Sequence, residues 1–74
     1  MNLEEYTKEK LWQILVDITH ANVMYPTHKA YTRDSILQEK HDITPDELAA
    51  RLNMPVGEAL VILQELQAEN KATV

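Results

Sequence analysis

The stretch "ITPDELAARLNMPVGEALVILQELQAENK", residues 43–71, predicts two helices and the tight turn that joins them. Thr44 and Glu47 have the spacing of a capping box, and Pro45 suits the first position of the helix that follows. This first helix is expected to end at the residue before Asn53. Asparagine tolerates the left-handed backbone conformation better than most residues do, so Asn53 is the expected turn residue.

The second helix of this stretch is expected from about Val56 to Glu69, and the spacing of its apolar residues assigns its two faces. The inward face is predicted to hold Ala59, Leu60, Leu63 and Leu66. The outward face is predicted to hold Gly57, Glu58, Val61, Gln64, Glu65 and Ala68. Asn70 is expected to end the helix in a left-handed conformation, and the tail "KATV", residues 71–74, predicts one short edge strand.

The N-terminal segment predicts another helix, from about Leu3 to Thr19, with Asn2 as its N-cap. Its apolar residues fall into two stripes that lie roughly 100° apart around the helix. The first stripe consists of Leu11, Ile14, Leu15 and Ile18. The second stripe consists of Trp12 and Val16, with Val23 beyond the helix end. A helix with two apolar stripes needs cover on two sides, one from its own core and the other from a partner or a second subunit.

Residues 22–31 are expected to be irregular, because Pro26 lacks an amide hydrogen and restricts the residue before it. A short helix from Arg33 to about Lys40 is expected to follow, with Thr32 as its N-cap. No internal repeat or low-complexity tract divides the chain, so residues 1–74 are expected to form a single domain.

The segment 33–74 resembles the helix-turn-helix core of winged-helix proteins, from a short lead helix through "ITPDELAARL", the turn "NMP" and "VGEALVILQEL". The resemblance implies a mainly α-helical fold with a three-helix core, to which residues 3–19 add an extra N-terminal helix. It departs from the family in having no room after Asn70 for a wing hairpin. The expected fold is therefore winged-helix-like, with the wing absent or truncated and at most a minimal β-strand.

The charge balance limits the partners that the chain can attract. Seven Lys and Arg residues stand against 12 Asp and Glu residues, so the net charge is −5. An acidic chain repels the phosphate backbone of nucleic acids at long range, so any contact with DNA needs a local basic patch or a partner. No apolar run approaches the ~20 residues that span a bilayer. The charged N-terminus does not resemble a secretory signal, and a cytoplasmic protein without membrane contact is expected.

The resemblance implies a transcription-associated regulatory protein, but the last helix lacks the basic residues that such proteins usually present. Weak or partner-assisted contact with DNA is therefore the expectation. The residues predicted to make that contact are His28, Lys29, Arg33, Lys40 and Arg51 at the backbone and Gln64 at a base edge.

An alternative function is that of a protein-interaction module that binds a basic partner. Its contact surface would be Glu58, Val61 and Glu65 on the outward face of the last helix. In either case a homodimer through the N-terminal helix is predicted, with Trp12 and Val16 as the contact residues.

Catalysis and metal binding have little support in the sequence. Ser35 is the single serine and has no nucleophile-elbow glycines around it, and a single glycine cannot build a phosphate-binding loop. Asp17 and His20 could share a helix face, but without cysteine a structural zinc site lacks thiolate ligands. The chain is expected to be non-enzymatic, with no cofactor.

Overall fold

The computed structural model describes residues 2–72, with side chains through residue 70, and these residues are mainly helical. The elements in chain order are α1 (Leu3–Ala21), α2 (Tyr25–Tyr31), the π-helical turn η1 (Thr32–Ile36), α3 (Leu37–Glu39), α4 (Pro45–Leu52) and α5 (Val56–Ala72). Because α2, η1 and α3 follow one another without a break, the described chain forms four helical segments. No strand occurs within residues 2–72.

Helix α1 begins as the sequence predicts. The Asn2 side chain accepts hydrogen bonds from the backbone amides of Glu4 and Glu5, which confirms Asn2 as the N-cap. The helix runs to Ala21, two residues beyond the predicted end at Thr19.

The connection between α1 and α2 is shorter than predicted, because Pro26 starts a helix and does not follow one. The side chain of Asn22 accepts from the amide of Met24, and its carbonyl accepts from the amide of Tyr25, so the chain turns sharply there. Pro26 then lies in the first turn of α2, where a missing amide hydrogen costs no helical hydrogen bond. The prediction of an irregular segment over 22–31 was therefore wrong beyond Met24.

Thr32 was predicted to cap a new helix, and the structure contradicts this. Its backbone is helical, with φ −61° and ψ −46°, and its side chain is fully buried. The hydroxyl donates to the carbonyl of His28 at 2.7 Å, which satisfies it inside a continuous helix. The predicted helix over 33–40 is thus the second half of a longer segment that begins at Tyr25.

The join between α4 and α5 matches the sequence prediction closely. Thr44 and Glu47 form both hydrogen bonds of the capping box, and Pro45 occupies the first turn of α4. Asn53 adopts the left-handed conformation, with φ 55° and ψ 53°, and its amide donates to the carbonyl of Ala49. The chain therefore reverses over Asn53 and Met54 before α5 begins.

The far end of α5 differs from the prediction. The helix continues through Asn70 to Ala72, so Asn70 is not a left-handed cap. The predicted strand at 71–74 is contradicted at Lys71 and Ala72, which are helical, and its last two positions lie outside the described residues.

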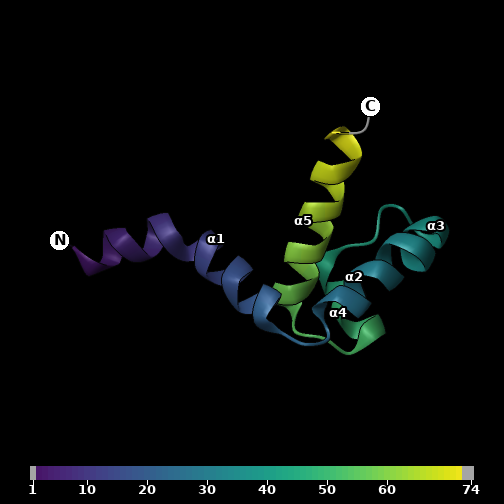
Figure 1. Ribbon diagram of the computed structural model, residues 1–74, viewed down its shortest axis with the longest axis horizontal. Helices are drawn as coiled ribbons and strands as arrows, with labels where there is room; N and C mark the ends of the chain where they lie inside the picture. Colours follow the sequence, from purple (N-terminus) through teal and green to yellow (C-terminus); the bar gives the residue numbers. More distant parts are fainter. Residues whose placement is uncertain (1, 73–74) are drawn as a thin grey trace.

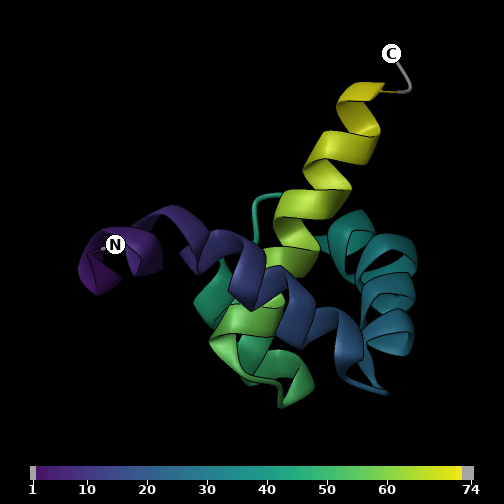
Figure 2. The same cartoon turned by 60° about the vertical axis from the view of Figure 1, so that its left-hand side comes forward.

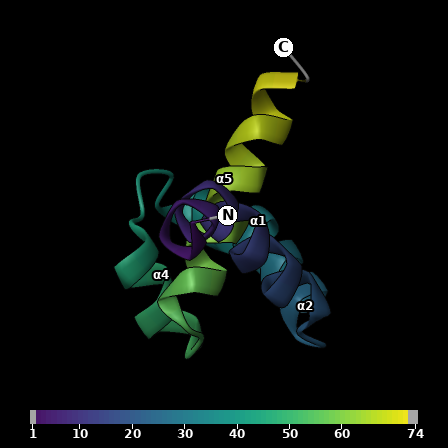
Figure 3. The same cartoon turned by 90° about the vertical axis from the view of Figure 1, so that its left-hand side faces the viewer.

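The core lies where α4, α5 and the α2–α3 segment meet. Its buried residues are Ile36, Ile43, Leu48, Met54, Ala59, Ile62 and Leu66. Seen along α1 from its N-terminal end, α4 and α2 lie on either side of α5 (Figure 3). Helix α1 crosses α5, and its first turns extend away from the other helices (Figures 1 and 2). The three-helix core is thus complete without the N-terminal half of α1.

The hydrogen bonds that Lys40 and Thr44 donate to Glu47 make the stability of α4 depend on pH. A hydrogen bond from Lys40, joined by those from Thr44, lowers the pKa of Glu47 from 4.5 to about 2. Because the pKa falls on folding, Glu47 contributes stability above about pH 4.5 that is lost as the pH drops toward 2. In urea titrations from pH 5 to pH 2, Glu47→Gln should therefore lose less stability than the wild type. Asp46→Asn removes a charge from the same turn without breaking the capping box, and an equal loss in wild type and Glu47→Gln would contradict the prediction.

Candidate functional site

Helix α5 follows the predicted faces in part, since Ala59 and Leu66 are buried and Gln64 and Ala68 are exposed as predicted. Three other positions differ. Glu58 and Val61, predicted on the outward face, are 4% and 0% exposed, while Leu60, predicted inward, is 41% exposed. Val61 lies one turn after Gly57, whose α-carbon faces the Leu15 side chain of α1. The side of α5 that carries Gly57 and Val61 is therefore turned toward α1, and the predicted orientation of this face was wrong.

Glu58 is tolerated inside because two side chains from the α1–α2 region satisfy its carboxylate. His28 Nδ1 lies 2.6 Å from Glu58 Oε2, and Asn22 Nδ2 donates to Oε1 at 3.0 Å. The side chains of His28 and Glu58 are 17% and 3% exposed, so this pair is shielded from solvent. A buried carboxylate without such partners would destabilise the fold.

Glu65 is the centre of a second polar group on the same side of α5. Its Oε1 accepts from the Tyr25 hydroxyl at 2.5 Å, and its Oε2 lies 2.7 Å from His20 Nε2. Lys29 Nζ approaches to 3.6 Å. Burial by itself would raise the pKa of Glu65, but the hydrogen bonds from Tyr25 and His20 and the charge of Lys29 together lower it. The Glu65 carboxylate is therefore paired within the protein and is not a free surface charge.

Lys29 extends this group to the third glutamate of α5. Its Nζ donates to Glu69 Oε2 at 2.5 Å and lies 5.8 Å from the centre of the Tyr25 ring. Burial would lower the pKa of Lys29, but the hydrogen bond to Glu69 and the contacts with Tyr25 and Glu65 raise it. All three glutamates of α5 are thus engaged by side chains from α1, α2 and the turn between them.

The sequence contained a signal for this arrangement that the prediction missed. Tyr25, His28 and Lys29 follow the i, i+3, i+4 spacing of one helix face. The glutamates of α5 follow the i, i+7, i+11 spacing of one face as well. Two complementary polar stripes on neighbouring helices indicate a polar contact between them, which the prediction of an irregular segment at 22–31 concealed.

The outer face of α5 is uncharged among the described side chains. We define it as Val56, Leu60, Gln64 and Gln67, all of which are exposed and follow helical spacing. At 100° per residue, this face lies roughly 160° around the helix from the glutamates. Gln64 is therefore where the sequence predicted it, whereas its predicted neighbours Glu58 and Glu65 are on the other side.

The cations predicted to contact DNA are paired within the molecule. His28 and Lys29 belong to the contacts with α5 already described, which leaves them 17% and 19% exposed. The other three form exposed ion pairs, Arg33 with Asp34, Lys40 with Glu47 and Arg51 with Glu39. Exposed ion pairs contribute little to stability, so these three cations can exchange a carboxylate for a phosphate, but they do not form a free basic patch.

Helix α1 uses its two apolar stripes differently from the prediction. Thr19 is buried, and Leu15 and Val16 are half-buried, so this side faces the body. Leu11, Ile14 and Ile18 are 59%, 41% and 66% exposed. The predicted contact residue Val16 is thus turned partly inward, while Trp12 remains 43% exposed.

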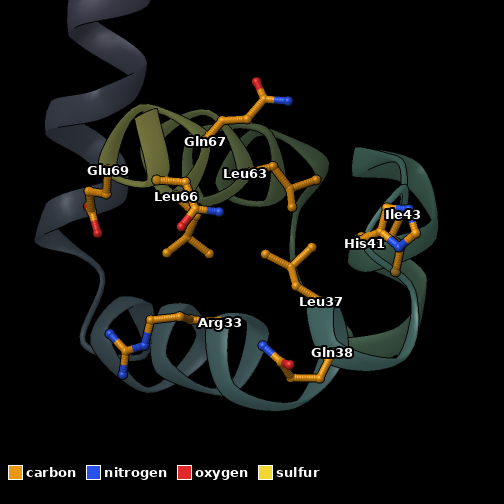
Figure 4. A pocket seen from close by; sticks show the side chains of 10 residues that line it. Arg33, Leu37, Gln38, His41, Ile43, Leu63, Leu66, Gln67 and Glu69 are labelled. Atoms are coloured by element: carbon orange, nitrogen blue, oxygen red, sulfur yellow. The ribbon is translucent and has the colours of Figure 1, made fainter. Parts of the chain in front are cut away.

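A groove of about 460 Å³ separates the second half of α5 from the α2–α3 segment. Leu37, Leu63 and Leu66 point into it from the two sides, and polar side chains such as Arg33 and Gln67 stand around it (Figure 4). Its floor is the apolar core, and no cluster of titratable groups converges there.

The histidines do not gather into a metal site. No group of three or more histidine, aspartate or glutamate side chains within the described residues is placed to hold a metal ion. Asp17 accepts a hydrogen bond from Gln13, and His20 pairs with Glu65, so the two residues predicted to share a face have separate partners.

Comparisons with protein-family models, curated proteins and solved structures found no significant match to this chain. No helix within the described residues is long and apolar enough to cross a membrane.

Proposed function

We propose that this protein is a non-enzymatic helix-turn-helix regulatory protein that presents the outer face of α5 to DNA. In this proposal α4, the Asn53 turn and α5 are the helix-turn-helix of a winged-helix-like domain without a wing, and α2–α3 is the lead helix. The observation that carries the proposal is the orientation of α5, because the glutamates that would repel phosphates pair with side chains from α1, α2 and the turn between them, on the side away from the outer face.

The outer face fits the major groove chemically. A glutamine side chain can form two hydrogen bonds to an adenine, and an apolar side chain can contact the methyl group of a thymine. Gln64 and Gln67 supply the amides, while Val56 and Leu60 supply the apolar contacts. The net charge of −5 keeps the attraction to phosphates small, so we expect weak binding with a preference for A·T-containing sites.

The alternative function, in which an acidic face of α5 binds a basic protein, lacks the exposed surface that was predicted for it. Glu58 and Val61 are buried, and Glu65 is held by Tyr25 and His20. A basic partner would have to displace these contacts before it met a carboxylate.

The test is a fluorescence-anisotropy titration with labelled A·T-rich and G·C-rich duplexes at about 50 and 200 mM salt. We expect a Kd of roughly 1–100 µM for the A·T-rich duplex at the lower salt and weaker binding at the higher salt. Gln64→Ala combined with Gln67→Ala should reduce the A·T preference about tenfold, since a bidentate contact is worth about 1–3 kcal/mol of discrimination.

The matched control is Gln13→Ala, which removes an exposed glutamine from α1 and should leave DNA affinity unchanged. Absence of binding at about 50 mM salt, where attraction to phosphates is strongest, would contradict the proposal. Binding that is insensitive to Gln64 and Gln67 would show that another surface makes the contact.

A further inference from the structure

The exposed apolar side of α1 has no cover from the rest of the described chain. We define the α1 stripe as Leu11, Ile14 and Ile18, which are 59%, 41% and 66% exposed. The adjoining side of the helix, at Leu15 and Thr19, packs toward α5. Large side chains at consecutive positions of one helix face are typical of a contact surface, whereas single exposed apolar residues are common on any protein.

The spacing of the α1 stripe is that of a helix pair. Leu11, Ile14 and Ile18 are separated by three and then four residues, as are the a and d positions of a coiled coil. The first turns of α1 extend beyond the other helices, which leaves space beside the N-terminal half of α1 (Figures 1 and 2).

The charges beside the stripe fit a second copy of the chain in one direction. Lys10 and Asp17 are seven residues apart and stand along the same edge of the α1 stripe. When two copies of α1 run antiparallel with Ile14 facing Ile14, Leu11 of each lies opposite Ile18 of the other. Lys10 of each then lies beside Asp17 of the other, and the symmetry makes this contact twice.

From these observations we infer that the protein forms an antiparallel homodimer through the α1 stripe. A parallel pair would set each residue level with its own copy and would not bring Lys10 to Asp17. The dimer differs from the sequence prediction in its contact residues, because the α1 stripe replaces Trp12 and Val16. It stands on α1 alone and does not depend on contact with DNA.

Cysteine cross-linking tests both the surface and the direction, because the chain contains no cysteine of its own. Under mild oxidation Ile14→Cys should form a disulfide-linked dimer. Leu11→Cys and Ile18→Cys should each cross-link poorly alone but efficiently when mixed. Efficient cross-linking of all three single variants would indicate parallel pairing and overturn the inference.

Sedimentation equilibrium at 5–500 µM measures the association itself. Ile14→Glu should weaken dimerisation at least tenfold, because it places two carboxylates face to face at the centre of the interface. The control Gln38→Glu adds the same charge at an exposed position of α3, outside α1, and should leave the dimer intact.

Charge exchange completes the test. Lys10→Glu should weaken association by roughly threefold to tenfold, and the double variant with Asp17→Lys should restore it. Circular dichroism of each variant verifies that α1 remains helical. A wild-type protein that is monomeric at 500 µM would overturn the inference, as would failure of the double variant to recover.

Discussion

Val61→Glu is expected to unfold the protein, whereas Leu60→Glu, one residue earlier, is expected to leave it folded. Val61 is fully buried and Leu60 is 41% exposed. A glutamate at position 61 would place an unpaired charge against α1, and such a change costs about 4 kcal/mol or more. A domain of this size has a total free energy of unfolding of roughly 4–11 kcal/mol. The cost of the substitution is a large part of it, so the variant should be largely unfolded.

Circular dichroism and urea denaturation measure this contrast directly. Leu60→Glu should remain within about 1 kcal/mol of the wild type, since its side chain reaches solvent. Together the two variants determine which face of α5 is inside. If Val61→Glu kept its stability while Leu60→Glu unfolded, α5 would have the orientation that the sequence alone predicts.

Glu58→Ala is expected to destabilise the protein by about 3 kcal/mol, because it leaves two half-buried partners without their acceptor. His28 Nδ1 and Asn22 Nδ2 both contact the Glu58 carboxylate, whose side chain is 3% exposed. Removal of one member of a buried pair costs more than the pair contributes, since the remaining group loses water without gaining a new partner. Thermal or urea denaturation provides the measurement.

A matched control is available on the same helix. Glu69→Ala removes a carboxylate that pairs with Lys29 but is 55% exposed, and it should cost about 1 kcal/mol or less. A double-mutant cycle of Glu58→Ala with His28→Ala should give a coupling energy of about 1 kcal/mol or more. Equal costs for Glu58→Ala and Glu69→Ala, with no coupling to His28, would show that the pair does not hold α2 against α5.

The polar contact between α2 and α5 also connects the fold to the proposed function. His28 and Lys29 were predicted to meet phosphates, and they meet Glu58 and Glu69 instead. By pairing with the glutamates, these residues keep the acidic side of α5 turned toward α2, so that the opposite, uncharged face is left exposed. Their contribution to contact with DNA would therefore be indirect.

Local sequence predicted the helix ends that depend on a few adjacent residues. The Asn2 cap, the capping box of Thr44 and Glu47 and the left-handed Asn53 are all present. Each depends on hydrogen bonds or backbone strain within about four residues, so neighbouring side chains are sufficient to determine it. Pro26 misled the prediction because proline ends one helix or begins another with equal ease.

What the sequence by itself determined is the set of helices around the Asn53 turn and the two apolar stripes of α1. Tertiary structure decided which faces are buried. Helix α5 carries apolar residues on nearly every side, so helical periodicity does not select an inward face. Its orientation depends on α1 and on His28, more than 25 residues away in sequence. The contact from His28 satisfies the Glu58 carboxylate, which would otherwise destabilise the fold when buried. Packing between distant segments, and not local preference, therefore turned Leu60 toward solvent and Glu58 and Val61 inward.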